Sequence, residues 1–325
     1  MIQRFADSAS AHHALVSAET AREGALQDLD IHSITDAAIA QMGGTPDPRL
    51  REIMAAAVRH LHDFAREVNL KPDEWVAGIG FLTAVGQMCT AYRQEFILLS
   101  DVMGLSRLVD VMHDSTGREH SGTESSLLGP FFRESAPVIE PGGTLACIPG
   151  APEVTMYGRV LDTAGRGVPH AWIDAWQTDA DGLYDLQAND PSVMDMRGRV
   201  RCDVEGRFHF RTVKPLGYSI PMDGPVGALV KQQDRHGMRP AHIHLLVQAP
   251  GFRELVTALY LADDVNIDSD TVFGVSTSLI IAVRDDLADS PSPGQPSIRH
   301  DFTLSRATEE GGGRVGSDPS RLLPA

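Results

Sequence analysis

The sequence of 325 residues contains few cysteines, and these are far apart. Cys89, Cys147 and Cys202 are odd in number and form no CxxC pair. They support neither a disulfide framework nor a cysteine zinc site, and they fit a reducing compartment best. The remaining composition is ordinary. A content of 42% hydrophobic and 22% charged residues is typical of a globular chain and excludes a disordered, collagen-like or coiled-coil protein.

Positive charge is also scarce. Lys and Arg number 28 against 44 Asp and Glu, which gives a formal net charge of -16. Such a charge repels phosphate backbones and anionic membrane surfaces, so we expect neither nucleic acid nor a membrane as partner. The longest apolar runs are far shorter than the roughly 20 residues that a membrane span needs. The first thirty residues contain no apolar stretch of signal-peptide length, and we therefore expect a soluble, cytoplasmic protein.

Proline is rare in the first 125 residues, which hold three of the twenty prolines. From Leu50 to Val68, apolar residues recur every three or four positions, which is the spacing of one helical face. Asp47 is placed to cap this helix, with Pro48 in its first turn. A second helix is predicted after Pro72, and two shorter ones between residues 96 and 112. The first 125 residues are therefore predicted to be helical.

The second part of the chain follows a junction rich in Ser, Gly and Pro at residues 115–150. Beyond it, short β-branched or aromatic runs alternate with turn signals, which indicates an antiparallel sandwich. The runs are VTMYGRVLD, VPHAWIDAW, GRFHFRTV, HIHLLVQAP and ELVTALYLA. We predict a mainly β protein with a helical N-terminal domain and junction at 1–135, an antiparallel β-sandwich domain at 136–305 and a flexible C-terminal tail at 306–325.

His242 and His244 flank Ile243 in an apolar run with strand character. Because side chains alternate along a strand, both imidazoles project to the same side and form a bidentate metal platform. Two buried histidines satisfied by hydrogen bonds are the equally common alternative, since His-x-His is a short motif. The nearest acids, Asp234 and Glu254, lie in polar segments that are typical of a surface. Any further metal ligands must therefore come from elsewhere in the chain.

Two of the five tyrosines stand in predicted loops. Tyr184 follows a tight turn, and Tyr218 lies in the segment PLGYSIP. Together with His242 and His244, they resemble the ferric iron ligands of the intradiol ring-cleavage dioxygenases. Three long segments match that family in order and spacing: GRVLDTAGRGVPHAWIDAWQTDADGLYD, FRTVKPLGYSIPMDGP and RHGMRPAHIHLLV. The resemblance extends from about residue 90 to about residue 283.

This resemblance implies a non-haem iron(III) centre, one per subunit, with Tyr184, Tyr218, His242 and His244 as ligands in a catalytic β-sandwich. Charge arithmetic supports it, because iron(III), two phenolates and one hydroxide sum to a neutral site that can be buried. An aromatic diol and O2 are the implied reactants. The bond between the two hydroxylated carbons is cleaved, and both oxygen atoms enter the product. The resemblance also implies that Tyr218 acts as an internal base and that Arg239 stabilises negative charge on the substrate.

Four further residues raise separate questions. Strand alternation places Arg239 off the face of the two histidines unless Pro240 turns the chain, and a surface arginine is the ordinary alternative. Ala258 occupies a position where catechol-cleaving relatives tend to have a glutamine near the iron, so any hydrogen bond from that side chain is absent. Trp172 and Trp176 share one strand face, and we expect them in the sandwich core.

The segments RQEFILLSDVMG and ESSLLGPFF resemble the hydroxyquinol 1,2-dioxygenase subfamily, which cleaves benzene-1,2,4-triol to 3-hydroxy-cis,cis-muconate or maleylacetate. Asp101 is the discriminating residue. A carboxylate in an apolar wall is costly unless it accepts a hydrogen bond, which the third hydroxyl of the triol supplies. A solvent-facing Asp at a helix end is the alternative. The subfamily match implies that the substrate pocket is lined by Leu98, Asp101, Leu127, Leu128, Gly129, Pro130, Phe131, Ile220, Pro221 and Val272.

The resemblance further implies a homodimer joined through the N-terminal helices, around bound lipid, with the apolar stripe at 50–68 as a contact. Three alternatives remain open at this point. A catechol or chlorocatechol 1,2-dioxygenase would use the same iron chemistry. A transthyretin-like binding module would need neither loop tyrosine nor the paired histidines. A zinc hydrolase built on His242 and His244 would need a further acid or histidine ligand.

Overall fold

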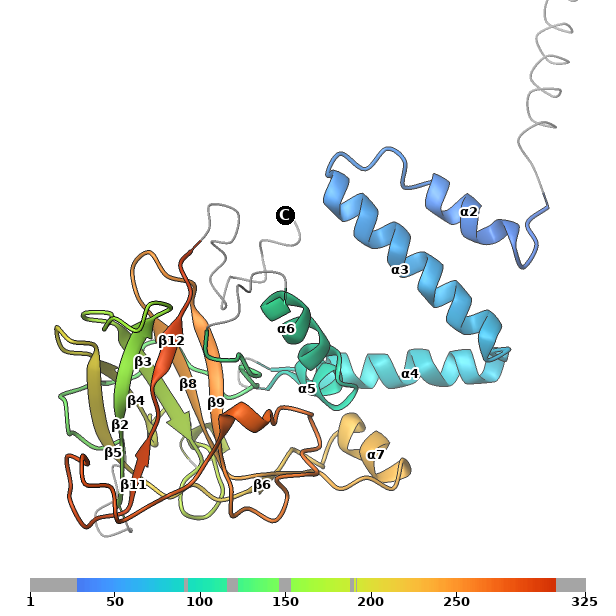
Figure 1. Cartoon of the computed structure of the whole chain (residues 1–325). Coiled ribbons are helices and arrows are strands. Elements are labelled where there is room, and N and C mark those ends of the chain that lie inside the picture. The colour runs from blue at the N-terminus through green and yellow to red at the C-terminus, as the bar shows by residue number, and fades with distance from the viewer. Residues whose placement is uncertain are drawn as a thin grey trace, which may run out of the picture. The chain divides into compact units, whose positions relative to one another are not determined.

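The computed structural model describes residues 28–90, 93–115, 122–145, 153–187, 190 and 192–307. By its contacts the chain divides into two compact units, residues 1–80 and residues 81–325 (Figure 1). The predicted domain boundaries follow composition rather than contacts and stay a prediction. Residues 308–325 of the predicted flexible tail lie outside the described residues. At the start of that tail, Arg306 pairs with Phe252, and its guanidinium lies 4.3 Å from the centroid of that ring.

The first unit contains α2 (Ser33–Ala40), α3 (Pro48–Glu67) and the beginning of α4 (Pro72–Met88). Both long predicted helices are confirmed. At the start of α3, the Asp47 carboxylate accepts hydrogen bonds from the backbone N–H groups of Arg49 and Leu50 at 2.8 and 3.2 Å. Pro48 fills the first turn, where no backbone donor is needed. This local chemistry explains why the helix begins at this residue.

Helix α2 was not predicted. Thr35 is its one buried residue, and the Thr35 hydroxyl lies 3.0 Å from Nδ1 of His62 on α3. Arg66 adds hydrogen bonds to the Thr35 hydroxyl and to the carbonyl of Ile31. Polar contacts, rather than an apolar stripe, therefore hold this short helix. Within the residues described, no helix is both long enough and apolar enough to cross a membrane.

The helices of the second unit are α5 (Glu95–Val102), α6 (Leu105–Ser115) and α7 (Pro225–Gln232). The first two confirm the predicted short segments, whereas α7 was not predicted. The carboxylate of Glu95, on α5, accepts a hydrogen bond from the backbone N–H of Val226 at 3.2 Å and so binds the first turn of α7. Leu98, Val226 and Val230 then pack in one buried apolar cluster. Contacts with α5, rather than local periodicity, stabilise α7.

Two main sheets form the rest of the second unit (Figure 1). The first has the order β1 (Val138–Ile139), β4 (Arg197–Arg201), β3 (Trp172–Gln177), β8 (His242–Gln248), β9 (Leu255–Leu261) and β10 (Ile280–Ile281). The second joins β11 (Ser297–Arg299), β2 (Glu153–Asp162), β12 (Phe302–Leu304) and β5 (Arg207–Val213). A short ribbon pairs β6 (Tyr218–Ser219) with β7 (Met238–Arg239). All five strand runs read from the sequence are present.

The prediction of an entirely antiparallel sandwich is wrong, because both sheets are mixed. β1 and β10 join the edges of the first sheet in parallel, and β11 and β12 pair in parallel with β2. These four strands are only two or three residues long, which is too short for a period-two pattern to show. Parallel pairing also brings together segments that are distant in the sequence, so no local sequence signal predicts this pairing.

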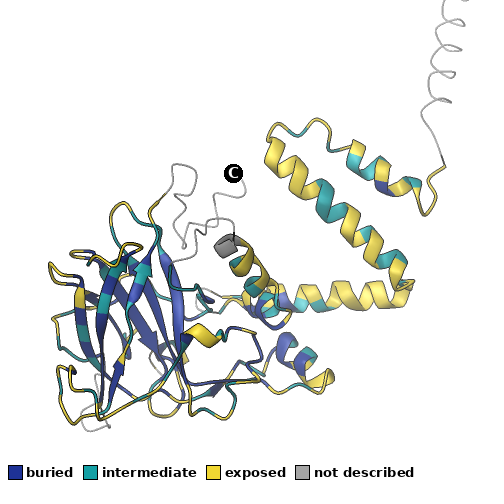
Figure 2. Cartoon of the chain, viewed as in Figure 1, coloured by how far each residue is buried: buried dark blue, intermediate teal, exposed yellow. Residues whose placement is uncertain are grey.

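The side chains of β8 project alternately from the two faces of the first sheet. Ile243, Leu245 and Val247 belong to the large buried cluster, which also takes in residues of the second sheet such as Met156 and Phe210. His242 and His244 alternate with them and therefore project from the opposite face. Figure 2 shows this strand region as almost entirely buried. Loops that carry Phe131 and Tyr184 cover the face with the histidines.

Candidate active site

The two histidines of β8 converge as their spacing predicts. His242 and His244 are 2% and 1% exposed, and their Nε2 atoms lie 3.0 Å apart. Nδ1 of His242 donates a hydrogen bond of 2.6 Å to the carbonyl of Pro240, so its Nε2 presents a lone pair to the site. Burial lowers the pKa of both imidazoles well below the usual value, with a further contribution from neighbouring positive charge. Both rings are therefore neutral, which is the form that binds metals.

Tyr184 lies in a loop that brings its hydroxyl group close to the two histidines. Its hydroxyl oxygen lies 3.4 Å from Nε2 of His242. The preceding turn is closed by Asp179, whose carboxylate accepts backbone hydrogen bonds from Asp181 and Leu183. The Tyr184 ring stacks on Phe131 at a centroid distance of 4.3 Å. Burial raises the pKa of Tyr184 well above its usual value, so the phenol needs a cation beside it to lose its proton.

A buried ion pair anchors this loop. Asp185 follows Tyr184 directly, and its side chain and that of Arg197 are each 2% exposed. Nε of Arg197 donates to Asp185 at 2.6 Å, and a second contact between the same groups makes the pair bidentate. Arg197 also donates to the carbonyl of Phe131 at 3.1 Å, and Arg133 adds a further contact to Asp185 at 3.0 Å. These bonds tie Tyr184 and its stacking partner to β4.

Tyr218 and Arg239 enter from the β6–β7 ribbon, in which they are directly paired. Tyr218 therefore lies in a two-residue strand rather than in the loop that the sequence indicated. Nη1 of Arg239 donates to the Tyr218 hydroxyl at 3.3 Å and lies 3.2 Å from Nε2 of His242. The chain breaks its strand at Pro240 and Ala241, between β7 and β8. This break turns Arg239 into the site, which is the exception that strand alternation left open.

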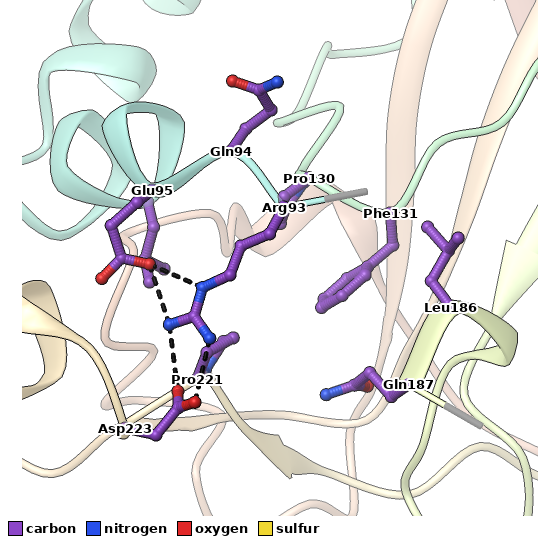
Figure 3. A pocket seen from close by; sticks show the side chains of 10 residues that line it. Arg93, Gln94, Glu95, Pro130, Phe131, Leu186, Gln187, Pro221 and Asp223 are labelled. Atoms are coloured by element: carbon purple, nitrogen blue, oxygen red, sulfur yellow. Dashed lines mark hydrogen bonds and ion pairs between the residues drawn. The ribbon is translucent and has the colours of Figure 1, made fainter. Parts of the chain in front are cut away.

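A cavity of about 400 Å³ opens beside these residues. Figure 3 shows Phe131 and Leu186 across it from Arg93, which bridges Glu95 and Asp223. Four predicted pocket residues line this cavity: Leu98, Pro130, Phe131 and Pro221. Leu128 and Gly129 line an adjoining hollow of about 460 Å³ that shares Pro130. Leu127, Ile220 and Val272 are buried with Leu98 in one apolar cluster.

Asp101 lies three residues beyond Leu98 on α5, and thus on the same helix face, and it is 4% exposed. Burial raises its pKa to about 6, an effect that a hydrogen bond from Ser106 and the charge of Arg239 partly offset. Asp101 is not among the residues that line either cavity, so its contact with a substrate stays a prediction. The alternative of a solvent-facing Asp does not hold for this structure.

The comparisons with known proteins agree with this arrangement. The family model described as Dioxygenase matches residues 129–306, and one described as Catechol dioxygenase N terminus matches residues 47–120. The chain belongs to the intradiol ring-cleavage dioxygenases. It is 48% identical over 255 residues to the 6-chlorohydroxyquinol 1,2-dioxygenase of Cupriavidus pinatubonensis, covering 78% of this chain and 92% of that relative.

Two further members of the family are similar over most of their length. The hydroxyquinol 1,2-dioxygenase of Rhodococcus opacus is 43% identical over 268 residues, covering 82% of this chain and 87% of the relative. The crystal structure of hydroxyquinol 1,2-dioxygenase from Pseudomonas putida has a TM-score of 0.76 at 42% identity, covering 85% of this chain and 99% of the other. This intradiol dioxygenase therefore shares fold and sequence with relatives named for hydroxyquinol.

The donor set fits the non-haem iron(III) on which intradiol dioxygenases generally depend. The two tyrosine rings meet edge to face at 5.2 Å, and the Tyr218 ring lies 5.7 Å from that of His242. Phenolate oxygens are hard anionic ligands that suit a trivalent cation, and neutral imidazoles complete the set without adding charge. The zinc alternative needed a third acid or histidine. In the part of the chain that the structure describes, no group of three or more His, Cys, Asp or Glu side chains is placed to hold a metal ion.

Sequence reasoning missed several residues of this dioxygenase site. Trp176, expected in the sandwich core, instead stacks on His244 at 5.0 Å and is its direct strand neighbour. On the other side, β9 places Ala258 opposite His244 and Tyr260 opposite His242. Strand alternation could have found Tyr260, since it lies two residues after Ala258. Nothing local pointed to Asp270, whose carboxylate binds Arg239.

Proposed function

We propose that this intradiol dioxygenase cleaves hydroxyquinol, benzene-1,2,4-triol, between its adjacent hydroxylated carbons. Both atoms of O2 are incorporated, and the product is 3-hydroxy-cis,cis-muconate, the tautomer of maleylacetate. The observation that carries the proposal is the close grouping of two tyrosines and two histidines at one buried point, beside a cavity lined by Leu98, Pro130, Phe131 and Pro221. The relatives named for hydroxyquinol support the choice of substrate.

We propose that Tyr184, Tyr218, His242 and His244 hold one iron(III) per subunit. When bound, the metal orients the two diol oxygens and makes the ring reactive toward O2. The remaining chemistry belongs to the chain. Tyr218 takes a proton from a diol hydroxyl, and Nη1 of Arg239, which donates to the Tyr218 oxygen at 3.3 Å, holds that oxygen in place. The same guanidinium stabilises the negative charge that develops on the substrate oxygens.

The cavity walls select the substrate. Leu98, Pro130, Phe131 and Pro221 provide apolar surface for one aromatic ring, which they shield from water. Asp101 is proposed to accept a hydrogen bond from the third hydroxyl. A catechol lacks this hydroxyl and leaves the buried carboxylate unpaired, which costs free energy in the transition state.

Measurements of kcat/KM for hydroxyquinol and catechol, with oxygen uptake as the readout, test the substrate. The wild type should prefer hydroxyquinol. In Asp101→Ala, the ratio of the two kcat/KM values should fall by about 1–3 kcal/mol, the scale of one buried polar interaction. Iron content and colour should not change. A wild type that prefers catechol, or an unchanged ratio in the variant, would reject hydroxyquinol selection and leave the ring-cleavage assignment in place.

Metal analysis and a visible spectrum test the cofactor separately. Tyrosinate bound to iron(III) absorbs in the visible range, so the isolated protein should be red to purple. Folded protein that is colourless and loaded with zinc would contradict the iron assignment. A second candidate substrate class is catechol or chlorocatechol, because the N-terminal family model is described by catechol. The substrate panel above distinguishes the two.

We further propose a homodimer joined through the N-terminal helices, with lipid bound between them. The support is the exposed apolar surface of α3 and α4. Leu61, Phe64, Trp75 and Val76 are each more than 50% exposed, which is costly for a helix that stays unpartnered in water. Light scattering at micromolar concentration should give the mass of a dimer, and mass spectrometry of an organic extract should detect the lipid. A monomer would reject this assembly without affecting the chemistry.

We propose a cytoplasmic location because the described cysteines are free thiols. Cys202 is buried and Cys89 is half-buried, and neither forms a disulfide. Thiols of this kind persist in a reducing compartment. Fractionation of cells that express the full chain should recover the protein in the cytoplasmic fraction.

A further inference from the structure

The two edges of the Arg239 guanidinium contact different groups. One edge faces Asp270, with Nε donating to Oδ1 at 3.1 Å and Nη2 donating to Oδ2 at 3.2 Å. The remaining nitrogen, Nη1, faces the Tyr218 hydroxyl and Nε2 of His242. Because a guanidinium is planar and rigid, fixing one edge also fixes the direction of the other. The Asp270 carboxylate therefore decides where Nη1 points.

Asp270 is itself held by the loop that follows it. Its side chain is 2% exposed. Oδ1 accepts a hydrogen bond from the backbone N–H of Val272 at 3.3 Å, and Oδ2 accepts one from that of Gly274 at 3.0 Å. Phe273, between them, has a φ of 60°, a left-handed conformation that costs free energy for a residue with a side chain. The loop thus adopts a strained turn that wraps the carboxylate and prevents it from rotating with its partner.

A series of hydrogen-bonded hydroxyl groups contacts Nη2 of Arg239, which belongs to the edge that faces Asp270. Nη2 of Arg239 also donates to the Tyr260 hydroxyl oxygen at 3.3 Å. The Tyr260 hydroxyl lies 2.9 Å from Oγ of Ser126, which donates in turn to the carbonyl of Gly274 at 3.0 Å. Since the Ser126 proton goes to the carbonyl, Tyr260 must donate to Ser126 and accept from Arg239. These hydrogen bonds therefore run in one direction, from Arg239 through Tyr260 and Ser126 to the carbonyl of Gly274, and they favour the observed orientation of the guanidinium.

Because Gly274 has no side chain, it leaves space for Tyr260, Arg239 and Asp270. A Cβ atom at this position would lie 2.6 Å from the Tyr260 hydroxyl, 2.9 Å from Nη2 of Arg239 and 3.0 Å from Oδ2 of Asp270. All three distances are at or below the closest approach that a methyl carbon tolerates. A single added methyl group would therefore push Tyr260, Arg239 and Asp270 apart.

We propose that Asp270 is a positioning residue that, with Tyr260, Ser126 and Gly274, locks the Arg239 guanidinium with Nη1 directed at Tyr218 and the metal donor set. The inference rests on the proposed ring-cleavage function. Among the described residues, Asp270 lines neither cavity and its side chain forms no hydrogen bond with a proposed metal ligand, so we expect it to act through Arg239. Its negative charge also balances the buried guanidinium, which would otherwise be unpaired. Because the Arg239 guanidinium is already in position, it stabilises the negative charge that develops on the substrate without reorganising during the reaction.

Asp270→Asn is the first test, measured on the iron-loaded enzyme with hydroxyquinol. The amide turns an NH2 group toward the guanidinium, so kcat should fall by about tenfold to a hundredfold while KM changes less, as expected for an interaction made mainly in the transition state. Iron stoichiometry and the visible spectrum of the resting protein should stay as in the wild type. Asp286→Asn is the matched control, because Asp286 forms the same bidentate pair with Arg284 on the surface. It should leave kcat unchanged.

A double-mutant cycle separates positioning from mere stability. If Asp270 acts through Arg239, Asp270→Asn should cost no further activity once Arg239→Ala has been made. Independent, additive losses would overturn the proposal, and so would a fully active, iron-loaded Asp270→Asn protein. If Asp270→Asn does not fold, Gly274→Ala and Tyr260→Phe decide the matter. Each should lower kcat at unchanged iron content, and wild-type kcat in both would overturn the proposal. A wild type that binds no iron or cleaves no diol would instead reject the proposed function itself.

Discussion

Helix α3 exposes large apolar side chains, whereas strand β8 buries polar ones. Helix α3 has no buried residue, and large apolar side chains such as Phe64 are more than half exposed. In β8, every residue except the last is buried, including two histidines. Figure 2 shows this contrast between exposed helices and buried strands. Apolar exposure indicates a surface that needs a partner, whereas buried polar groups indicate a site whose hydrogen bonds and charges are already assigned.

The largest expected effect comes from removing a metal donor in the buried region. His244→Ala should lose iron and activity together, with a fall in kcat of more than about a hundredfold, since it removes one of four proposed protein ligands. His60→Ala on α3 is the control, because that histidine is exposed. Iron content measured by atomic absorption should be normal in the control. Stoichiometric iron in His244→Ala would show that this residue is not a ligand.

The ion pair beneath Tyr184 should be the next most sensitive element. Asp185→Asn leaves the buried guanidinium of Arg197 without its counter-charge, so the free energy of unfolding should fall by about 3–5 kcal/mol. The matched control is Asp63→Asn, which breaks the surface pair with Arg66 on α3 and should change stability little. Denaturant unfolding of the two variants measures the difference. Equal effects would mean that burial does not set the strength of these pairs.

The pH dependence of stability should reveal the buried carboxylate of Asp101. Burial raises its pKa from the ordinary value of 3.8 to about 6. The folded protein therefore binds this proton more tightly than the unfolded chain, and the contribution of the group to the free energy of unfolding falls as pH rises from about 4 to about 6. Asp101→Asn should lack this decline. The stability of the variant relative to wild type should rise across that range and then level off, and a constant difference would contradict deep burial of the charge.

The smallest effect on chemistry is expected from the helical region. Phe64→Glu places a charge in the exposed apolar surface of α3, so it should break the proposed dimer. The subunit itself should change in stability by no more than about 0.5 kcal/mol, as is usual for exposed positions. Light scattering measures the first outcome, and kcat per subunit should stay at the wild-type value. A variant that remains dimeric would place the contact elsewhere.

Much of the fold was predictable because its signals are local. The cap at Asp47 and the apolar spacing after it predicted α3, and β-branched or aromatic runs between turn signals predicted the five long strands. The edge strands β10, β11 and β12 were not predictable, since two or three residues show no period and their partners are remote in sequence. Helix α7 escaped prediction for a similar reason, because Glu95 on a distant helix stabilises its first turn.

The sequence by itself determined the types and the order of the proposed metal ligands. The His242–Ile243–His244 spacing and strand alternation require two imidazoles on one face, and the tyrosine segments identify the family before any coordinates are known. Only the tertiary structure decided how Arg239 enters the site. The break at Pro240 turns it inward, and Asp270, 31 residues later, holds it there. Alternation is a property of one strand and can be read from the sequence, whereas a hydrogen bond between remote segments depends on where the whole chain brings them together.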